Sequence, residues 1–249
     1  MADVRHLFRT TEGVPIPAVT AEQMREVDRI AVEDFGLGIL QMMENAGRNL
    51  AGNVMEMMGG SFGEVTVLAG AGGNGGGGLC AARHLHNRGY QVNLILDRQA
   101  SALGDAATNQ LRILQAAGLR PVDPSGAQEA IRRADVVVDA LIGYSLRGSP
   151  RGRAAELIEL SNEHAKRVLS LDVPSGLDAT TGETPGAVVH PDRTLTLALR
   201  AEPQLVALLP SEAGQWPGIR STGMYSFSIS VSIFFTPTHF GAATDSSHE

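Results

Sequence analysis

The N-terminal part of the chain carries apolar residues at helical spacing. This pattern predicts two amphipathic helices, one from Thr20 to about Asp34 and one from roughly Ile39 to Met58. Thr20 and Gln23 have the spacing of a capping box at the start of the first helix, and the Gly59–Gly60 pair ends the second. The methionines of the second helix occupy inward positions, so we expect them to fill the core rather than to form a binding surface.

From residue 64 onward, short apolar runs alternate with helical patterns. Strands are predicted at Glu64–Ala69, Gln91–Leu96, Arg120–Val122, Asp135–Leu141 and Arg167–Asp172. Helices are predicted between them, at Leu79–Arg88, at Asp105–Ala117, in a segment capped by Ser125 with Gln128, and at Arg153–His164. Apolar strands separated by helices are typical of a parallel sheet that is covered on both faces. The pattern therefore predicts an α/β fold.

The pattern changes after Pro191. Strands with little helix between them are predicted at Thr194–Leu199 and Gln204–Leu209, and the alternation in Ser226–Phe235 suits a half-buried edge strand. Residues 241–249 are expected to be disordered. No internal repeat or linker divides the chain, so we expect one domain over residues 1–249 with its core at about 20–236 and flexible termini.

Composition narrows the class of protein. The 249 residues are 43% hydrophobic and 19% charged, which is typical of a soluble globular protein. A net charge of -7 without a basic cluster argues against a nucleic-acid partner. Cys80 is the only cysteine, so no intramolecular disulfide forms and a reducing compartment is expected. No secretory signal or long apolar run is present, which argues against a membrane segment and favours a cytoplasmic location.

A glycine-rich stretch follows the first predicted strand of the sheet. Gly70, Gly72 and Gly75 match the G-x-G-x-x-G pattern, and Asp97 ends the next strand, which is the context of a dinucleotide site. The stretch holds so many glycines that this match is partly automatic, and the motif alone is weak evidence. A P-loop is excluded because Leu79 stands where lysine is required.

Polar residues follow three of the predicted strands. Asn74 comes after the first, Asp139 lies at the end of another, and Asp172 ends a third and leads to Ser175. Because the carboxyl ends of parallel strands lie at one edge of a sheet, we expect these side chains to converge on one crevice. Two close carboxylates would also perturb each other's protonation unless a cation lay between them. The alternative is that each aspartate caps a neighbouring helix or turn.

Other candidate residues favour ordinary roles. His84 and His86 lie two residues apart on a predicted helix and point to different faces, so we expect surface histidines rather than a metal-binding pair. Lys166 is the only lysine, and its position favours a solvated side chain over Schiff-base chemistry. Ser175 lacks the G-x-S-x-G context of a serine nucleophile.

Five motifs, in order along the chain, resemble a known family. They are MRxxD at Met24–Asp28, QMMENAG at Gln41–Gly47, GxGGNGGxGLxAARHL at Gly70–Leu85, VDALIG at Val138–Gly143 and LDVPSGLDATTG at Leu171–Gly182. Together they resemble the YjeF N-terminal domain family, the NAD(P)H-hydrate epimerases, from about Thr20 to Thr196. The resemblance implies a three-layer αβα sandwich with a Rossmann-like, mostly parallel sheet. It also implies a homodimer that interconverts the C6 epimers of hydrated NADH or NADPH, a metabolite-repair reaction.

The resemblance also implies roles for particular residues. Asn74, Asp139 and Ser175 would hold one potassium ion per subunit, and Asp172 would transfer the proton and contact the hydrated nicotinamide ring. No organic cofactor beyond the substrate is implied, and a separate dehydratase would act on the S epimer. The implied substrate-binding residues are Gly73, Asn74, Gly75, Gly76, Gly77, Gly143, Tyr144, Ser145, Leu146, Arg147, Gly148, Ser149 and Asp172.

The sequence departs from the family in the glycine-rich stretch. The family reads Gly-Asn-Asn-Gly-Gly-Asp-Gly there, whereas this chain has Gly73 for the first asparagine and Gly77 for the aspartate. These losses favour a second hypothesis, a ligand-binding or scaffold protein of impaired activity. A third is an NAD(P)-dependent oxidoreductase in which Asp97 binds the ribose. The retained polar residues at the strand ends favour the epimerase.

Overall fold

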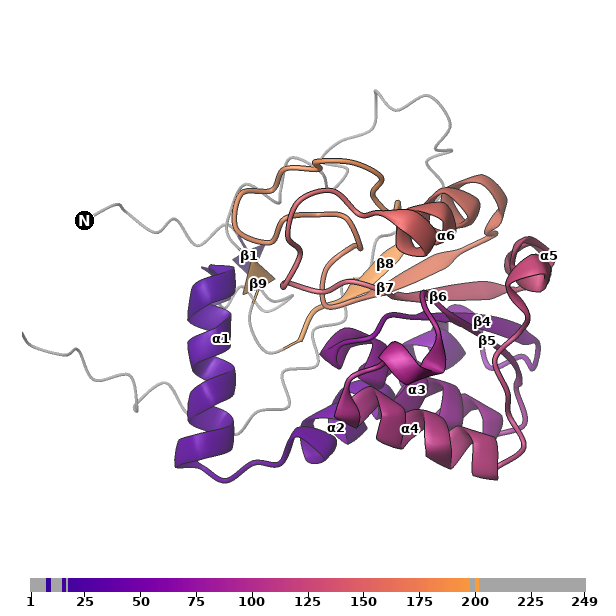
Figure 1. Ribbon diagram of the computed structural model, residues 1–249, viewed down its shortest axis with the longest axis horizontal. Coiled ribbons are helices and arrows are strands. Elements are labelled where there is room, and N and C mark those ends of the chain that lie inside the picture. The colour runs from indigo at the N-terminus through magenta and orange to yellow at the C-terminus, as the bar shows by residue number, and fades with distance from the viewer. Residues whose placement is uncertain (1–7, 10–14, 17, 198–199, 202–249) are drawn as a thin grey trace, which may run out of the picture.

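The computed structural model describes residues 8–9, 15–16, 18–197 and 200–201, and its centre is a five-stranded parallel sheet (Figure 1). The strand order is β5-β4-β6-β7-β8, so the chain starts near the middle of the sheet and crosses over to reach both edges. The predicted parallel sheet is therefore confirmed. The strands are β4 (Glu64–Ala69), β5 (Gln91–Leu96), β6 (Val136–Ala140), β7 (Val168–Leu171) and β8 (Arg193–Leu195).

Helices cover both faces of this sheet and make three layers (Figure 1). Alternate residues of the strands point to opposite faces, and each face has its own apolar core. In β6, Val136 and Val138 belong to one core and Val137 to the other. One face is covered by α2 (Ile39–Met57), α3 (Gly73–His86) and α4 (Asp105–Ala116), and the other by α5 (Ala127–Arg133) and α6 (Gly152–His164).

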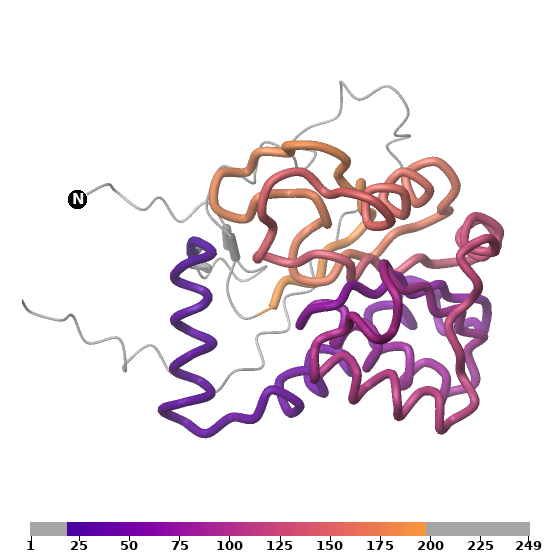
Figure 2. Tube along the Cα trace, viewed as in Figure 1, coloured from indigo at the N-terminus to yellow at the C-terminus, as the bar shows by residue number. Residues whose placement is uncertain are grey.

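The first helix, α1 (Ala21–Arg29), stands to one side of the sandwich in Figures 1 and 2. Its predicted capping box is confirmed, because Oγ1 of Thr20 accepts from the Gln23 amide at 3.2 Å and Gln23 Oε1 accepts from the Thr20 amide at 2.8 Å. A wider π-helical segment, Ile30–Asp34, continues α1 and completes the predicted first helix. Met24 is the buried residue of α1.

The remaining elements are short. Two 3-10 turns lie at Ala100–Ala102 and Pro124–Gly126. Two pairs of two-residue strands form outside the main sheet, β1 (Phe8–Arg9) with β2 (Pro15–Ile16), and β3 (Ala18–Val19) with β9 (Arg200–Ala201). No helix in the described ranges is both long enough and apolar enough to cross a membrane.

Helix α3 corrects one prediction. It begins at Gly73, well before the predicted start at Leu79, so most of the glycine-rich stretch is helical rather than a loop. Gly75, Gly76, Gly77 and Gly78 are all buried. Glycine disfavours a helix interior in isolation, but here α3 packs so closely on its surroundings that larger side chains have no room.

Three smaller predictions also change. Residues 120–122 form no strand, and only Pro121 makes a single bridge, with Leu94. The turn before α5 is capped by Asp123 rather than Ser125, since Oδ1 of Asp123 accepts from the Ser125 amide at 3.0 Å. Of the strand predicted at 194–199, residues 194–195 belong to β8, 196–197 are not in a strand, and 198–199 lie outside the described residues. The strands predicted at 204–209 and 226–235 and the disordered end at 241–249 lie outside the described residues.

Candidate active site

The bend between β4 and α3 brings two strand ends into contact. The Gly70 amide donates to the Ala140 carbonyl at 3.0 Å, and a Cβ atom on Gly70 would lie 1.9 Å from the carbonyl oxygen of Leu141. A Cβ atom on Gly75 would lie 1.7 Å from the Gly70 carbonyl oxygen. These glycines are therefore required by the approach of the protein's own backbone.

The predicted substrate-binding glycines fall into two groups. Gly73, the first residue of α3, has open space where a side chain would stand. Gly76 and Gly77 are buried, and their missing Cβ atoms face Met43 and Leu171. The Gly76 amide donates to the Gly72 carbonyl at 3.0 Å, so the amides at the helix start that lack a helical acceptor are those before it, at Gly73, Asn74 and Gly75.

Asp139 forms a buried polar centre at the end of β6. Its Oδ1 accepts from the Ser175 hydroxyl at 2.5 Å and its Oδ2 accepts from the Ser170 hydroxyl at 2.7 Å and the Ser175 amide at 2.9 Å. Its side chain is fully buried, and burial raises the pKa of its carboxyl group, against the opposing effect of these hydrogen bonds. Ser175 Oγ also accepts from the Ile142 amide at 2.8 Å, which ties the turn after β7 to the loop after β6.

Asp172 follows β7 and occupies an unusual backbone conformation. Its φ angle of 71° lies in the left-handed region, which aspartate tolerates better than most side chains do. Oδ2 of Asp172 accepts from the Tyr144 amide at 2.9 Å. The residue is 8% exposed, and burial together with the negative charge of Asp28 raises its carboxyl pKa to about 6.

Asn74 and Asp172 meet at Gly143. A Cβ atom on Gly143 would lie 2.7 Å from Asp172 Oδ2 and 3.4 Å from Asn74 Oδ1, so only glycine fits between the two side chains. Both amide atoms of Asn74 are buried and have no hydrogen-bond partner among the described residues. The loop that contains Gly143 follows β6, and its backbone amides donate to the side chains of Asp172 and Ser175 after β7. The polar groups that follow β4, β6 and β7 therefore lie at one edge of the sheet.

Helix α1 adds two residues, Arg25 and Asp28, whose individual roles could not be predicted from the sequence. The Tyr144 hydroxyl donates to Asp28 Oδ2 at 2.6 Å, and the Arg25 guanidinium lies over the Tyr144 ring, 6.0 Å from its centroid. Burial raises the pKa of Asp28, and burial and the Asp28 carboxylate both raise the pKa of Tyr144. Both α1 residues belong to the MRxxD motif, and their spacing of three residues places them on one helix face.

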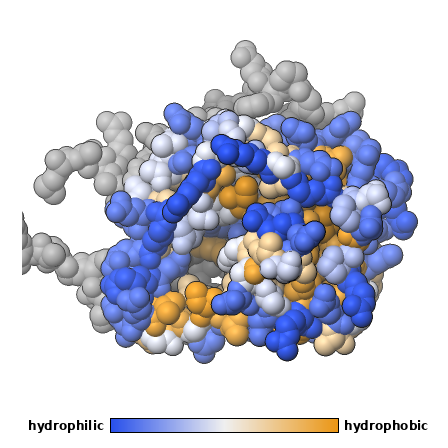
Figure 3. All heavy atoms as spheres, in the orientation of Figure 1, coloured by the Kyte–Doolittle hydropathy of each residue, from blue (hydrophilic) through white to orange (hydrophobic). Residues whose placement is uncertain are grey.

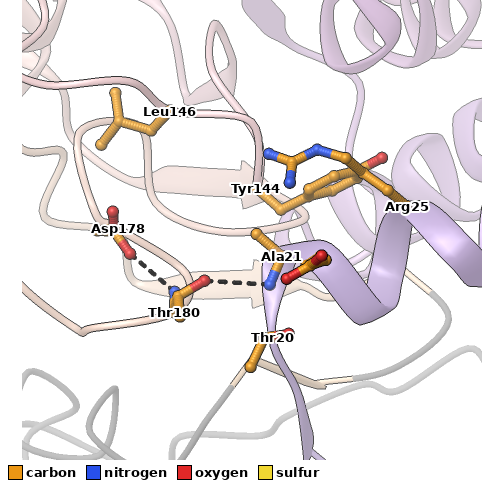
Figure 4. A pocket seen from close by; sticks show the side chains of 8 residues that line it. Thr20, Ala21, Arg25, Tyr144, Leu146, Asp178 and Thr180 are labelled. Carbon is orange, nitrogen blue, oxygen red and sulfur yellow. Dashed lines mark hydrogen bonds between the residues drawn. The ribbon is translucent and has the colours of Figure 1, made fainter.

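A cleft of about 290 Å³ opens between the start of α1 and the loops after β6 and β7 (Figure 4). Figure 3 shows the surface hollowed between α1 and the body of the molecule. The Ala21 amide donates to Thr180 Oγ1 at 3.1 Å, and the Thr180 amide donates to Asp178 Oδ1 at 2.9 Å. The lining residues are Thr20, Ala21, Glu22, Arg25, Tyr144, Leu146, Asp178 and Thr180.

The rest of the predicted phosphate-side loop lies near the surface. Ser145, Arg147 and Gly148 are exposed, whereas Leu146 and Ser149 are partly buried. Leu146 lines the cleft, and the Ser149 hydroxyl donates to the Pro185 carbonyl at 2.5 Å. The loop therefore runs from the Asp172 side chain outward along the cleft.

Other candidates have internal partners. The Asp97 carboxylate accepts from Nε and Nη2 of Arg98, at 3.0 and 2.7 Å, which leaves it poorly placed to bind a ribose. The prediction of a surface histidine is wrong for His84, which is buried and bonds to Glu44 at 2.8 Å because α2 packs over that side of α3. Lys166 is exposed as predicted and pairs with Asp135.

The fold and the site define an α/β protein whose polar site lies at the carboxyl ends of a parallel sheet. Residues 39–201 match the family model described as YjeF-related protein N-terminus. The chain belongs to this family.

Curated relatives agree with this assignment. An NAD(P)H-hydrate epimerase of Dehalogenimonas lykanthroporepellens is 51% identical over 215 residues, which cover 85% of this chain and 84% of the relative. One from Rhodopirellula baltica is 37% identical, over 74% of this chain and 75% of the relative. A bifunctional NAD(P)H-hydrate repair enzyme of Hyperthermus butylicus is 41% identical over 72% of this chain but only 34% of that enzyme.

A solved structure of a yeast protein has the same fold. It superposes with a TM-score of 0.70 at 24% identity and covers 77% of this chain and 84% of its own. The fold assignment therefore rests on a solved structure as well as on the sequence relatives.

Proposed function

We propose that this protein is an NAD(P)H-hydrate epimerase, an isomerase of metabolite repair that interconverts the R and S epimers of hydrated NADH and NADPH. The observation that carries the proposal is the buried Asp172 carboxyl beside Asn74 at the carboxyl end of the sheet, in a chain 51% identical to a curated epimerase. A ligand at this edge of a parallel sheet is the general expectation for such folds.

Asp172 supplies the acid and base chemistry in this proposal. In its protonated form it donates a proton to the hydroxyl group at C6 of the hydrated ring, and the C–O bond breaks with its electron pair leaving on water. The ring nitrogen donates its lone pair to the resulting cation. Water then adds to the opposite face of C6, and the Asp172 carboxylate accepts its proton. A pKa of about 6 suits a group that must both give and take a proton near neutral pH.

The oxygen atoms at the site suit a potassium ion. Asn74 Oδ1 is buried without a hydrogen-bond partner among the described residues, and the buried Asp139 carboxylate is hydrogen-bonded only by neutral groups. We propose that Asn74, Asp139 and Ser175 hold the ion. When bound, it would offset the negative charge that burial makes costly at Asp139.

Thermal unfolding tests the ion without using activity. Potassium chloride is expected to raise the Tm by several degrees over choline chloride at equal ionic strength, because the ion binds only the folded site. Asn74→Ala is the sharpest variant, since Asn74 makes no side-chain hydrogen bond among the described residues and its loss removes a ligand without breaking one. An equal response of wild type and Asn74→Ala would reject the site.

A coupled assay tests the epimerase. The protein is mixed with an epimer mixture of hydrated NADH and an S-specific dehydratase, and regeneration of NADH is followed after the S fraction is used up. We expect the protein to accelerate consumption of the R fraction by at least about 100-fold over the spontaneous rate, in line with general acid–base catalysis. Asp172→Asn should abolish the acceleration, since the amide cannot exchange the proton.

A second candidate is a protein that binds hydrated nucleotides without turning them over. Gly73 and Gly77 favour it, because they lack the side chains that the family carries at those positions. Gly77, however, faces Leu171 and Ala46, so in this chain the position serves helix packing. Tight binding of hydrated NADH with no acceleration in the coupled assay would establish this candidate.

We further propose a cytoplasmic homodimer that works with a separate dehydratase. The single cysteine supports a reducing compartment. The exposed apolar side chains of Phe35, just before α2, and of Ile39 and Leu40, at its start, support a contact with a second copy. Light scattering at micromolar concentration tests the assembly. A mass of one chain, 26.2 kDa, would exclude the dimer.

A further inference from the structure

Tyr144 connects helix α1 to the acid–base residue through two different groups. Its backbone amide donates to Asp172 Oδ2 at 2.9 Å, and its side-chain hydroxyl donates to Asp28 Oδ2 at 2.6 Å. The structure therefore contains a continuous path from Asp28 through Tyr144 to Asp172. A Cβ atom on the preceding residue, Gly143, would lie 2.7 Å from Asp172 Oδ2 and 3.4 Å from Asn74 Oδ1, so a shift of this loop changes the surroundings of the Asp172 carboxyl group.

Asp28 is the main polar link between α1 and this loop. Within the described ranges, it is the one residue of α1 whose side chain hydrogen-bonds outside residues 20–34. Arg25, one turn earlier, lies over the Tyr144 ring, so the helix contacts both the face and the hydroxyl group of the same side chain (Figure 4 shows Arg25 and Tyr144). Asp28 is partly buried, and the Tyr144 hydroxyl is its hydrogen-bond donor.

We propose that Asp28 and Tyr144 act as a pair of positioning residues, which hold the Tyr144 amide against Asp172 and so keep the Asp172 carboxyl group in one rotamer for proton transfer. This inference rests on the proposed epimerase function. Neither side chain exchanges a proton with the substrate. Their effect is on the fraction of time that Asp172 is correctly oriented, and small misplacements of a reacting group are costly in rate.

The hydrogen bond, rather than the charge, is the essential part of the link. A neutral oxygen at position 28 can still accept from the Tyr144 hydroxyl, so Asp28→Asn keeps the link and removes only the charge. Asp28→Ala removes the acceptor. Tyr144→Phe removes the donor and leaves the ring under Arg25, so that packing against α1 is retained.

Steady-state kinetics of these variants in the coupled assay test the proposal. We expect Asp28→Ala and Tyr144→Phe each to lower kcat about tenfold while KM changes less than about twofold, since orientation of Asp172 affects the chemical step more than binding. Asp28→Asn is expected to stay within about threefold of wild type. The double variant Asp28→Ala with Tyr144→Phe should be no slower than either single variant, because both remove the same interaction.

Matched controls separate this effect from loss of fold. Glu26→Gln changes an exposed carboxylate of the same helix that pairs with Arg29, and it should leave kcat unchanged. Circular dichroism and Tm establish that each variant is folded. Equal kcat in Asp28→Ala and Glu26→Gln, or losses that multiply in the double variant, would overturn the positioning role.

The outcomes also distinguish this inference from the proposed function. An inactive wild type rejects the epimerase itself. An active wild type, an inactive Asp172→Asn and fully active Asp28 and Tyr144 variants reject only the positioning pair. A rise in KM with unchanged kcat in Tyr144→Phe would instead make Tyr144 a ground-state binding residue and would equally overturn the proposal.

Discussion

Asp172 combines two features that are unfavourable in an isolated residue. Its backbone lies in the left-handed region although it is not a glycine, and its carboxyl group is buried where the ionised form is poorly solvated. Both persist because the turn after β7 is fixed by the bonds from Ser175 to Asp139 and by the Tyr144 amide. The surrounding structure therefore supports a residue that would be selected against on stability alone.

The stability of Asp172→Asn relative to wild type should depend on pH. The pKa of this carboxyl rises from 3.8 to about 6 on folding, so its stabilising contribution is present below pH 3.8 and is lost as the pH rises to about 6. Asparagine tolerates the left-handed backbone and stays neutral. At about 1.4 kcal/mol per pH unit, the variant should become more stable than wild type by about 3 kcal/mol above pH 6.

Urea unfolding at pH 4 and pH 8 measures this difference. The two proteins should have similar free energies of unfolding at pH 4 and differ at pH 8. A variant that is less stable than wild type at pH 8 would show that the ionised carboxylate is well accommodated. Asp34→Asn, at an exposed position, is the matched control for the change of aspartate to asparagine itself.

Helix α3 shows how packing between elements overrides the preference of single residues. Gly75 lies against the Gly70 carbonyl, and Gly78 against Ala140, so α3 approaches the sheet more closely than a helix with side chains at these positions. Gly73 has no such neighbour. Within one turn of the same helix, Gly75 is therefore required by packing, whereas Gly73 is not.

Alanine substitutions at these two positions should therefore differ in their effect on stability. Gly75→Ala should destabilise the protein by more than about 3 kcal/mol, because its Cβ would meet rigid backbone at 1.7 Å. Gly73→Ala should leave stability unchanged or raise it by up to about 1 kcal/mol, since alanine favours the helix and costs less chain entropy. Thermal unfolding measures both, and similar effects of the two substitutions would contradict the packing described for α3.

Most of the sheet could be predicted from strand periodicity, whereas contacts between distant segments could not be predicted. β4 and β5 have the predicted bounds because their apolar runs are flanked by clear turns. Placing Asn74, Asp139 and Asp172 at one edge needed only the rule for parallel strands. The start of α3 was misplaced because intrinsic preference argues against a glycine helix. The Asp28–Tyr144 bond left no periodic signal, since it joins a helix and a loop far apart in the chain.

At the scale of the whole molecule, α1 and α3 differ sharply in how they are attached. α3 contributes ten buried residues and lies between α2, α4 and the sheet, whereas α1 stands beside the sandwich and has one buried residue. Buried apolar contacts set the free energy needed to open an element locally. The cleft next to Tyr144 is therefore bounded on one side by the less strongly held helix.

Hydrogen exchange tests this difference. Backbone amides of Met24–Arg29 should exchange through openings that cost at least about 2 kcal/mol less than those of Leu79–Leu85, because fewer contacts are lost. Mass spectrometry of peptic peptides resolves the two segments. Equal protection of both would mean that α1 opens only with the rest of the protein.

The crossover order of the strands has a consequence for how function arises during folding. Asn74, Asp139 and Asp172 follow β4, β6 and β7, and the central pairings β4–β6 and β6–β7 join segments that are distant along the chain. Such long-range pairings carry a loop-closure entropy cost, because the intervening chain is restricted when they form. The three polar residues are therefore far apart in the unfolded chain and come together only when both pairings have formed.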